Sequence, residues 1–263
     1  MYFDQQNKST IKLKKGFGLG GVFEHALSFF NAESEKRAFY VPQFLEKSDE
    51  FYMYQALKIA MNKGGISKPN PSVGCLILGK NDLILATGTT HEWGFEHAEK
   101  DAFSKISVGD LEGATVYLTL EPCTHSGKQP PCIDLFKDKK IARVVLGSLD
   151  PNPVVNGQGA RCLEELGIQV TVGVLEQECM AWNAAFFHEK LNGEPFIALK
   201  WAQSLDGCLA HDSGYSKWIS SQTSRYYTHW LRHKYDAIVV GAGTVLADHP
   251  ILNVRDLNLS KQH

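Results

Sequence analysis

Short apolar runs that alternate with helical segments are the feature that most constrains the fold of this chain. Residues 114–120 and 168–174 place apolar side chains at every second position, the period of a half-buried strand. Runs over 73–78, 83–88 and 142–147 are expected to be strands as well, the first two joined by a short turn into a hairpin. Because helical segments separate most of these runs, we expect an α/β fold in which helices cover both faces of a sheet in three layers.

Helix signals surround these strands. Ser48-Asp49-Glu50 is typical of a helix N-terminus, and Gly64-Gly65 ends the apolar pattern that follows it. Further helices are predicted from His97, over 160–166, and from the last strand to about Leu191, with a short helix opened by Pro131-Cys132. The sequence therefore predicts one α/β domain over residues 48–191, preceded by an irregular extension over residues 1–47.

A second unit is indicated from residue 192 to residue 263. Asn192-Gly193-Glu194-Pro195 is typical of a linker, after which we expect strands over 196–203 and 237–240 and a helix over 223–234. Because roughly seventy residues make a marginal independent core, this unit is interpreted as part of a larger domain or as a lid.

Composition excludes several classes of protein. The 263 residues are 43% hydrophobic, yet no uninterrupted apolar run approaches the roughly 20 residues of a membrane-spanning helix. Lys and Arg number 27 against 29 Asp and Glu, so a net charge of −2 offers nucleic acid or an acidic membrane no general attraction. Six cysteines without a secretory signal favour a reducing, cytoplasmic location. We expect the partner to be a small molecule and not nucleic acid or a membrane.

One histidine and two cysteines predict a metal site. His97-Ala98-Glu99 opens a predicted helix, Pro122-Cys123 follows a predicted strand, and Pro131-Cys132 opens the short helix. One imidazole and two thiolates suit tetrahedral Zn²⁺, and three protein ligands leave the fourth position to water, as in catalytic zinc sites. We therefore predict His97, Cys123 and Cys132 as zinc ligands.

Glu99 is predicted to be the catalytic base beside this metal. Two thiolates neutralise Zn²⁺ and weaken it as a Lewis acid, so a nearby carboxylate that takes a proton from water aids hydroxide formation. The same group can then pass its proton to a ring nitrogen and to departing ammonia. His-x-Glu followed by Pro-Cys is the known zinc-deaminase signature, so the hypothesis is hydrolytic deamination of an amino-substituted heterocycle.

The wider pattern resembles the RibD family of bifunctional riboflavin-biosynthesis deaminase/reductases. Cys123 and Cys132 lie nine positions apart, and this long loop separates the family from cytidine, adenosine and guanine deaminases. Over about residues 50–191 the resemblance is carried by Asn70-Pro71, Gly74, His97-Ala98-Glu99, Thr119-Leu120-Glu121-Pro122-Cys123, His125, Gly127-Lys128, Pro130-Pro131-Cys132 and Asp150-Pro151-Asn152-Pro153. Beyond the linker, Ser204-Leu205-Asp206-Gly207, Ser216-Lys217-Trp218-Ile219 and Ala247-Asp248 are similar to the first part of the family's dihydrofolate-reductase-like domain.

This resemblance implies two activities. The first hydrolyses the 2-amino group of 2,5-diamino-6-ribosylamino-4(3H)-pyrimidinone 5′-phosphate, with Asn70, Lys128, Asp150 and Asn152 lining the pocket. The second reduces the ribosyl to the ribityl side chain with NADPH. For this activity the resemblance implies substrate contacts from Ser216, Arg232, Leu252 and Arg255. It implies NADPH contacts from Ala202, Trp218, Thr244 and Asp248. Guanidinium groups at Arg232 and Arg255 suit a phosphate, and Trp218 suits a flat ring. We also expect a homo-oligomer, a dimer or a tetramer.

The sequence departs from the family pattern at three places. The spacing from His91 to His97 is shorter by one, so His91 is a candidate substrate contact only, and Gln129 replaces a more usual Thr. The family's later Glu-Gly-Gly segment and the strands that complete the reductase sheet are not found before residue 263, so we expect a partial reductase domain.

Alternative interpretations stay open at this point. His97 and the two cysteines could be core residues without a metal, or His125 or His91 could close a structural zinc site as fourth ligand. Two other functions fit the same residues: a tRNA or free-base deaminase, and a non-catalytic zinc module whose second unit is a dimer contact. The remaining cysteines are interpreted as small packing residues: Cys75, Cys162, Cys179 and Cys208.

Overall fold

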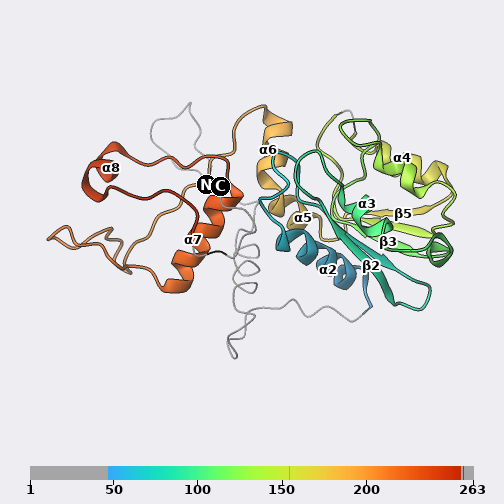
Figure 1. Cartoon of the computed structure of the whole chain (residues 1–263), viewed down its shortest axis with the longest axis horizontal. Coiled ribbons are helices and arrows are strands. Elements are labelled where there is room, and N and C mark those ends of the chain that lie inside the picture. The colour runs from blue at the N-terminus through green and yellow to red at the C-terminus, as the bar shows by residue number, and fades with distance from the viewer. Residues whose placement is uncertain (1–46, 154, 256, 258–263) are drawn as a thin grey trace. The chain divides into compact units, whose positions relative to one another are not determined.

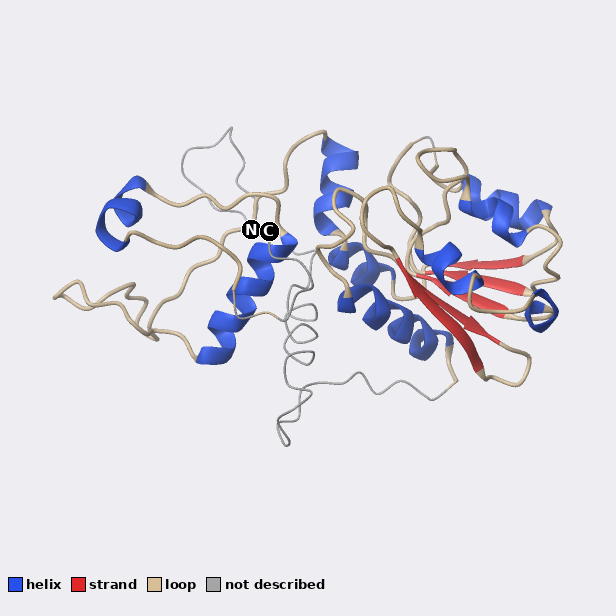
Figure 2. Cartoon of the chain, in the orientation of Figure 1, coloured by secondary structure: helices blue, strands red, loops and turns tan. Residues whose placement is uncertain are grey.

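A mixed five-stranded sheet organises the first of the two units of this protein (Figures 1 and 2). The computed structural model describes residues 47–153, 155–255 and 257, so the predicted extension lies outside the described residues except for Lys47. The strands are β1 (Gly74–Leu78), β2 (Ile84–Thr89), β3 (Thr115–Leu118), β4 (Arg143–Leu146) and β5 (Gln169–Val172), in the order β2-β1-β3-β4-β5. β1 is antiparallel to both of its neighbours, whereas β3, β4 and β5 are parallel.

Helices cover both faces of this sheet, which confirms the predicted three layers (Figure 1). Ile77 and Val144 belong to the buried cluster that packs under α3 and α4, whereas the ring of Tyr117 on the opposite face lies 5.4 Å from the ring of Tyr52 in α2. The helices of this unit are α2 (Asp49–Asn62), α3 (Ala98–Phe103), α4 (Gln158–Glu165), α5 (Glu176–Trp182) and α6 (Ala184–Asn192), with 3₁₀ helices at Val108–Leu111 and Cys132–Phe136.

The predicted ends of α2 are confirmed. The Ser48 hydroxyl accepts a hydrogen bond from the Phe51 N–H at 3.1 Å, which satisfies one of the unpaired amides of the first turn. Asp49 in that turn forms a two-fold hydrogen bond with the Arg143 guanidinium at 2.9 and 2.6 Å, which fastens α2 to β4.

Gly88 lets α3 lie directly on the sheet. A Cβ atom added at this position in β2 would overlap the carbonyl oxygen of Ala98, so only glycine permits this distance between strand and helix. The contact places the start of α3, where His97 and Glu99 lie, close to the end of β2.

The second unit, residues 196–257 of the described chain, contains α7 (Gln222–Lys234) and α8 (Ala242–Asp248). The predicted helix over 223–234 is confirmed. The predicted strands over 196–203 and 237–240 are wrong for this structure, because the described part of this unit forms no ladder of strands, and Ile197 and Val239 are exposed. None of the helices that the structure describes has the length and apolarity to cross a membrane.

Candidate metal centre

Four connecting segments meet at one edge of the sheet. The start of β1 lies beside the end of β2, where Gly74 pairs with Thr89, and beside the end of β3, where the Thr119 N–H donates to the Gly74 carbonyl at 3.1 Å. β4 is parallel to β3 and ends at the same edge. The segments that leave this edge carry predicted site residues from four places in the sequence: Asn70, His97, Cys123 and Asp150.

The three predicted zinc ligands come together at this edge. His97 Nδ1 lies 3.3 Å from Cys132 Sγ and 3.7 Å from Cys123 Sγ. Tetrahedral zinc with ordinary Zn–N and Zn–S bonds places neighbouring nitrogen and sulfur ligands about 3.6 Å apart. The donor set and its spacing therefore fit a zinc ion.

The elements around these ligands fix their positions. His97 is the N-cap residue of α3, and Cys132 begins the 3₁₀ helix Cys132–Phe136. The Cys132 N–H donates to Cys123 Sγ at 3.3 Å, and the Ile133 N–H donates to the Cys123 carbonyl at 3.2 Å. A hydrogen bond from the Cys132 thiol lowers the pKa of Cys123, which favours the thiolate, the form that binds metal.

Glu99 lies beside the ligands without joining them. It is the second residue of α3, its side chain is buried, and burial raises the pKa of its carboxyl group to about 7, an effect that the charge of Cys123 increases. A carboxyl group that titrates near neutral pH can both accept and return a proton. This is the property that the predicted role of Glu99 requires.

Neither His91 nor His125 joins the three donors among the described residues. Among the residues that the structure describes, Cys123 and Cys132 are the possible metal donors that group with His97. His91 faces Asp101 instead, with Nε2 at 3.3 Å from Oδ1, and His125 is exposed. The arrangement is therefore that of an open site with three protein ligands.

Asp150 and Asn152 lie in the segment between β4 and α4. The Asn152 N–H donates to Asp150 Oδ1 at 2.8 Å. Burial raises the pKa of the Asp150 carboxyl group. The Asp150 N–H donates to Glu121 Oε2 at 3.0 Å, and Glu121 stands two positions before Cys123 in the sequence.

The long segment between the two cysteines is tied to the segment before His97. The Lys128 ammonium group lies over the Trp93 ring, 3.0 Å from its centroid. The Gln129 side-chain amide donates to the Gly94 carbonyl at 2.9 Å and accepts from the Lys100 ammonium group at 3.2 Å. Sequence reasoning assigned no role to Trp93, for which no motif gave a signal.

Asn70 is half-buried in the turn before β1. Its carbonyl oxygen accepts a hydrogen bond from the Ser67 hydroxyl at 3.0 Å, which fixes the backbone of the turn. The structure thus brings the segment of Asn70 to the edge that carries the metal ligands.

In the second unit, the structure brings the two predicted phosphate-binding arginines together. The Arg232 guanidinium in α7 donates to the carbonyl groups of Ile251 and Asn253 at 3.2 and 3.0 Å, and Arg255 donates to the same Ile251 carbonyl at 3.3 Å. The predicted Leu252 lies between these two acceptors in the chain. Ser216 is half-buried in the loop before α7.

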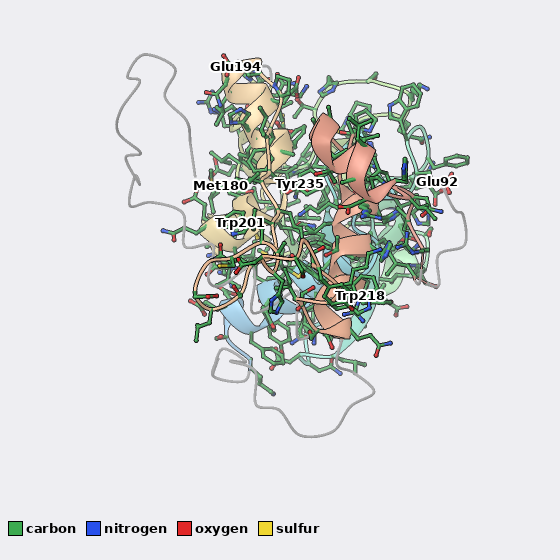
Figure 3. All side chains as sticks on the ribbon, turned by 90° about the vertical axis from the view of Figure 1, so that its left-hand side faces the viewer. Glu92, Met180, Glu194, Trp201, Trp218 and Tyr235 are labelled. Carbon is green, nitrogen blue, oxygen red and sulfur yellow. The ribbon has the colours of Figure 1, made fainter. Side chains whose placement is uncertain are left out.

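The predicted NADPH residues lie in three different segments of the second unit. The Trp218 ring, labelled in Figure 3, packs on the Arg225 guanidinium at 4.4 Å from its centroid. Ala202 lies in an extended segment, and Thr244 and Asp248 lie on α8.

Comparisons with known proteins agree with this geometry. Residues 46–148 match the family described as "Cytidine and deoxycytidylate deaminase zinc-binding region", and residues 195–263 match the "RibD C-terminal domain". Riboflavin biosynthesis protein RibD of Actinobacillus pleuropneumoniae is 45% identical over 212 residues, which are 81% of this chain and 56% of the relative. The RibD of Escherichia coli (strain K12) is 42% identical over 214 residues, 81% of this chain and 58% of the relative.

Solved structures show the same relationship. A diaminohydroxyphosphoribosylaminopyrimidine deaminase/5-amino-6-(5-phosphoribosylamino)uracil reductase from Thermotoga maritima is 41% identical, with a TM-score of 0.73 over 80% of this chain and 60% of the other. Acinetobacter baumannii RibD, form 1, is 38% identical, with a TM-score of 0.72 over 80% of this chain and 58% of the other. The chain thus spans a little more than half the length of the curated relatives it matches. Over the residues that these matches cover, the chain belongs to the RibD family, with a cytidine-deaminase-like domain followed by part of a dihydrofolate-reductase-like one.

Proposed function

We propose that residues 48–191 are a zinc-dependent hydrolytic deaminase that acts on 2,5-diamino-6-ribosylamino-4(3H)-pyrimidinone 5′-phosphate in riboflavin biosynthesis. One observation carries this proposal: three donors with the spacing of a tetrahedral zinc site lie beside the buried Glu99. The relative from Thermotoga maritima, whose name describes the corresponding deaminase, supports the choice of substrate.

His97, Cys123 and Cys132 would hold the zinc ion, which when bound supplies Lewis-acid activation of a water molecule. Glu99 takes a proton from the water molecule as the water oxygen forms the new C–O bond at C2 of the pyrimidine. It then returns this proton, by way of the ring nitrogen, to the 2-amino group, so that the C–N bond breaks and ammonia leaves. Asn70, Lys128, Asp150 and Asn152 are proposed to orient the substrate.

The test of this proposal is ammonia release by the purified chain, with its zinc content measured in parallel. We expect about one zinc per chain and turnover of the phosphoribosylated pyrimidine, but none of cytidine, adenine, guanine or a tRNA. Turnover of a free base or a tRNA instead would favour the second deaminase hypothesis. Bound zinc without turnover of any aminopyrimidine would favour the non-catalytic module.

A second activity, the reduction of the ribosyl to the ribityl side chain with NADPH, is proposed for the reductase domain to which residues 192–263 contribute. The match to the RibD C-terminal domain and the paired guanidinium groups of Arg232 and Arg255 support it. In that domain Ser216, Arg232, Leu252 and Arg255 would contact the substrate, and Ala202, Trp218, Thr244 and Asp248 would contact NADPH. Because this chain forms no strand among residues 196–257 as described, we expect it to oxidise NADPH far more slowly than it releases ammonia.

We further propose a cytoplasmic location and a homo-oligomer, a dimer or a tetramer. The six cysteines are all free in the structure, which suits a reducing compartment. Light scattering of the purified chain would measure its oligomeric state.

A further inference from the structure

Glu121 is a buried carboxylate that accepts hydrogen bonds from three backbone amides. Oε2 accepts from the Asp150 N–H at 3.0 Å and from the Gly157 N–H at 2.9 Å, and Oε1 accepts from the Ala160 N–H at 3.1 Å. Its side chain is only 3% exposed. A buried carboxyl group is costly unless its oxygens are hydrogen-bonded, so these three amides offset the cost of burying this side chain.

Two of the donors, Asp150 and Gly157, belong to the segment that connects β4 to α4, and the third, Ala160, belongs to the first turn of α4. The Glu121 N–H also donates to the Ser148 carbonyl at 2.9 Å, so backbone and side chain of one residue bind both ends of this segment. The first turn of α4 lies directly on the carboxylate: a Cβ atom added at Gly159 would come within 2.9 Å of Glu121 Cγ. Since the N-cap residue Gly157 has no side chain, Glu121 supplies the acceptor that an N-cap side chain ordinarily provides.

The same residue is joined to the metal ligands through the chain. Glu121 directly precedes Pro122-Cys123, and its carboxylate accepts from the Asp150 N–H. The Asp150 carboxylate in turn accepts from the Asn152 N–H. One carboxylate therefore connects a zinc ligand to the two polar residues of the neighbouring segment.

We propose that Glu121 is a positioning residue: its carboxylate fixes the segment of Asp150 and Asn152 relative to Cys123, so that the pyrimidine is held with its amino group toward the metal. This inference rests on the proposed deaminase function. In this role Glu121 contacts neither substrate nor metal, and it acts only through the three backbone amides.

The test compares the full-length wild-type chain with Glu121→Gln, which keeps the size of the side chain but replaces one acceptor oxygen by an NH₂ donor. Loss of a hydrogen bond to a buried charge predicts a KM for the phosphoribosylated pyrimidine about tenfold higher, with kcat changed less than about threefold. Zinc content should stay at the wild-type value. Hydrogen exchange of the amides of Asp150, Gly157 and Ala160 should become faster.

Asp49→Asn is the matched control, because Asp49 is another carboxylate with short hydrogen bonds, to Arg143 and Tyr117, but lies outside the proposed site. It should lower the melting temperature and leave KM unchanged. Should Glu121→Gln not fold, Glu121→Asp keeps the charge but is too short for all three amides, and it should raise KM as well.

An unchanged KM together with unchanged amide exchange overturns the inference, and so does loss of zinc from Glu121→Gln, which would make the residue a support of the metal instead. If the wild-type chain releases no ammonia, the proposed function fails. The exchange rates of the three amides still decide in that case whether Glu121 holds the segment.

Discussion

At the scale of single residues, the proposed deamination depends on the protonation of the Glu99 carboxyl group. Glu99 in the first turn of α3 is 4% exposed, so its carboxyl group has little water around it. Burial disfavours the charged form, which is why its pKa rises to about 7. Such a group exchanges protons with water and substrate at little cost, whereas an exposed glutamate would be too weak a base.

The variant Glu99→Gln should therefore lose ammonia release while it keeps zinc. General acid–base groups contribute roughly 10²- to 10⁴-fold to rate, so we expect kcat to fall at least about 10²-fold. Glu112→Gln, at an exposed carboxylate paired with Lys80 and Lys140, is the control and should behave as the wild type. Steady-state ammonia release and metal analysis measure both quantities, and full activity of Glu99→Gln would exclude this mechanism.

Removal of one thiolate should remove the metal. Cys132→Ser replaces a buried ligand sulfur by a hydroxyl that binds zinc poorly, so zinc content should fall well below one per chain and the melting temperature should drop. Cys162→Ser, at a half-buried cysteine on α4, should retain its zinc. Equal zinc contents in the two variants would contradict the ligand assignment.

Residue type and spacing were enough to predict which three donors the fold brings together, because zinc selects its donors by chemistry and the motif places them. Glu121 stands in that same motif, yet its role was not predicted. Its partners Asp150, Gly157 and Ala160 are distant in sequence, and they donate through backbone amides, which residue types do not identify. The contact of Lys128 with Trp93 was missed for the same reason.

At the scale of elements, one ion-pair network holds α3 to the sheet. Asp101 in α3 accepts from the Thr89 N–H of β2 at 3.0 Å and lies 3.0 Å from the Lys105 ammonium group and 3.3 Å from His91 Nε2. Burial alone would raise the pKa of Asp101, but the hydrogen bonds from Thr89, Lys105 and His91 outweigh it, and the pKa is lowered. The charged form is thus stabilised in the folded protein.

Asp101→Asn should destabilise the protein in a pH-dependent way. A carboxyl group whose pKa is lower when folded contributes stability above its unfolded pKa of about 3.9, and that contribution disappears as pH falls through the folded value. We expect the variant to lose about 1–2 kcal/mol of unfolding free energy at pH 7 and progressively less below about pH 4. Urea unfolding at several pH values measures this difference, and a loss that grows toward acid pH would contradict the assignment.

Periodicity predicted the strands of the first unit well and the helices less well. β3 and β5 lie within the two ranges predicted from alternation, and β4 lies within the run predicted over 142–147. The single helix expected after β5 is two helices, α5 and α6, which meet at Asn183. The Asn183 side chain accepts from the Ser72 N–H at 2.9 Å and donates to the Ser72 carbonyl at 3.1 Å, a tertiary contact over 111 positions that no local pattern reveals.

At the scale of the whole molecule, the two units differ in how they bury apolar side chains. In the first unit the inward residues of β1, β3 and β4 are fully enclosed between helices. In the second unit the apolar runs that predicted strands have no partner strand in the described residues, so their side chains stay in contact with water. A strand is stable only when neighbouring strands hydrogen-bond to its backbone and other elements pack against its apolar face. Sequence periodicity does not show whether those neighbours are present.

Two valines from runs predicted to be strands test this difference. Val144 in β4 is 0% exposed and Val239 is 91% exposed. Val144→Ala deletes two buried methyl groups and should lower the unfolding free energy of the chain by about 1–3 kcal/mol, whereas Val239→Ala should change it by less than about 0.5 kcal/mol. Chemical unfolding followed by far-ultraviolet circular dichroism measures both variants. Equal losses would mean that residues 237–240 pack as a buried strand in solution, and the contrast between the two units would then have to be abandoned.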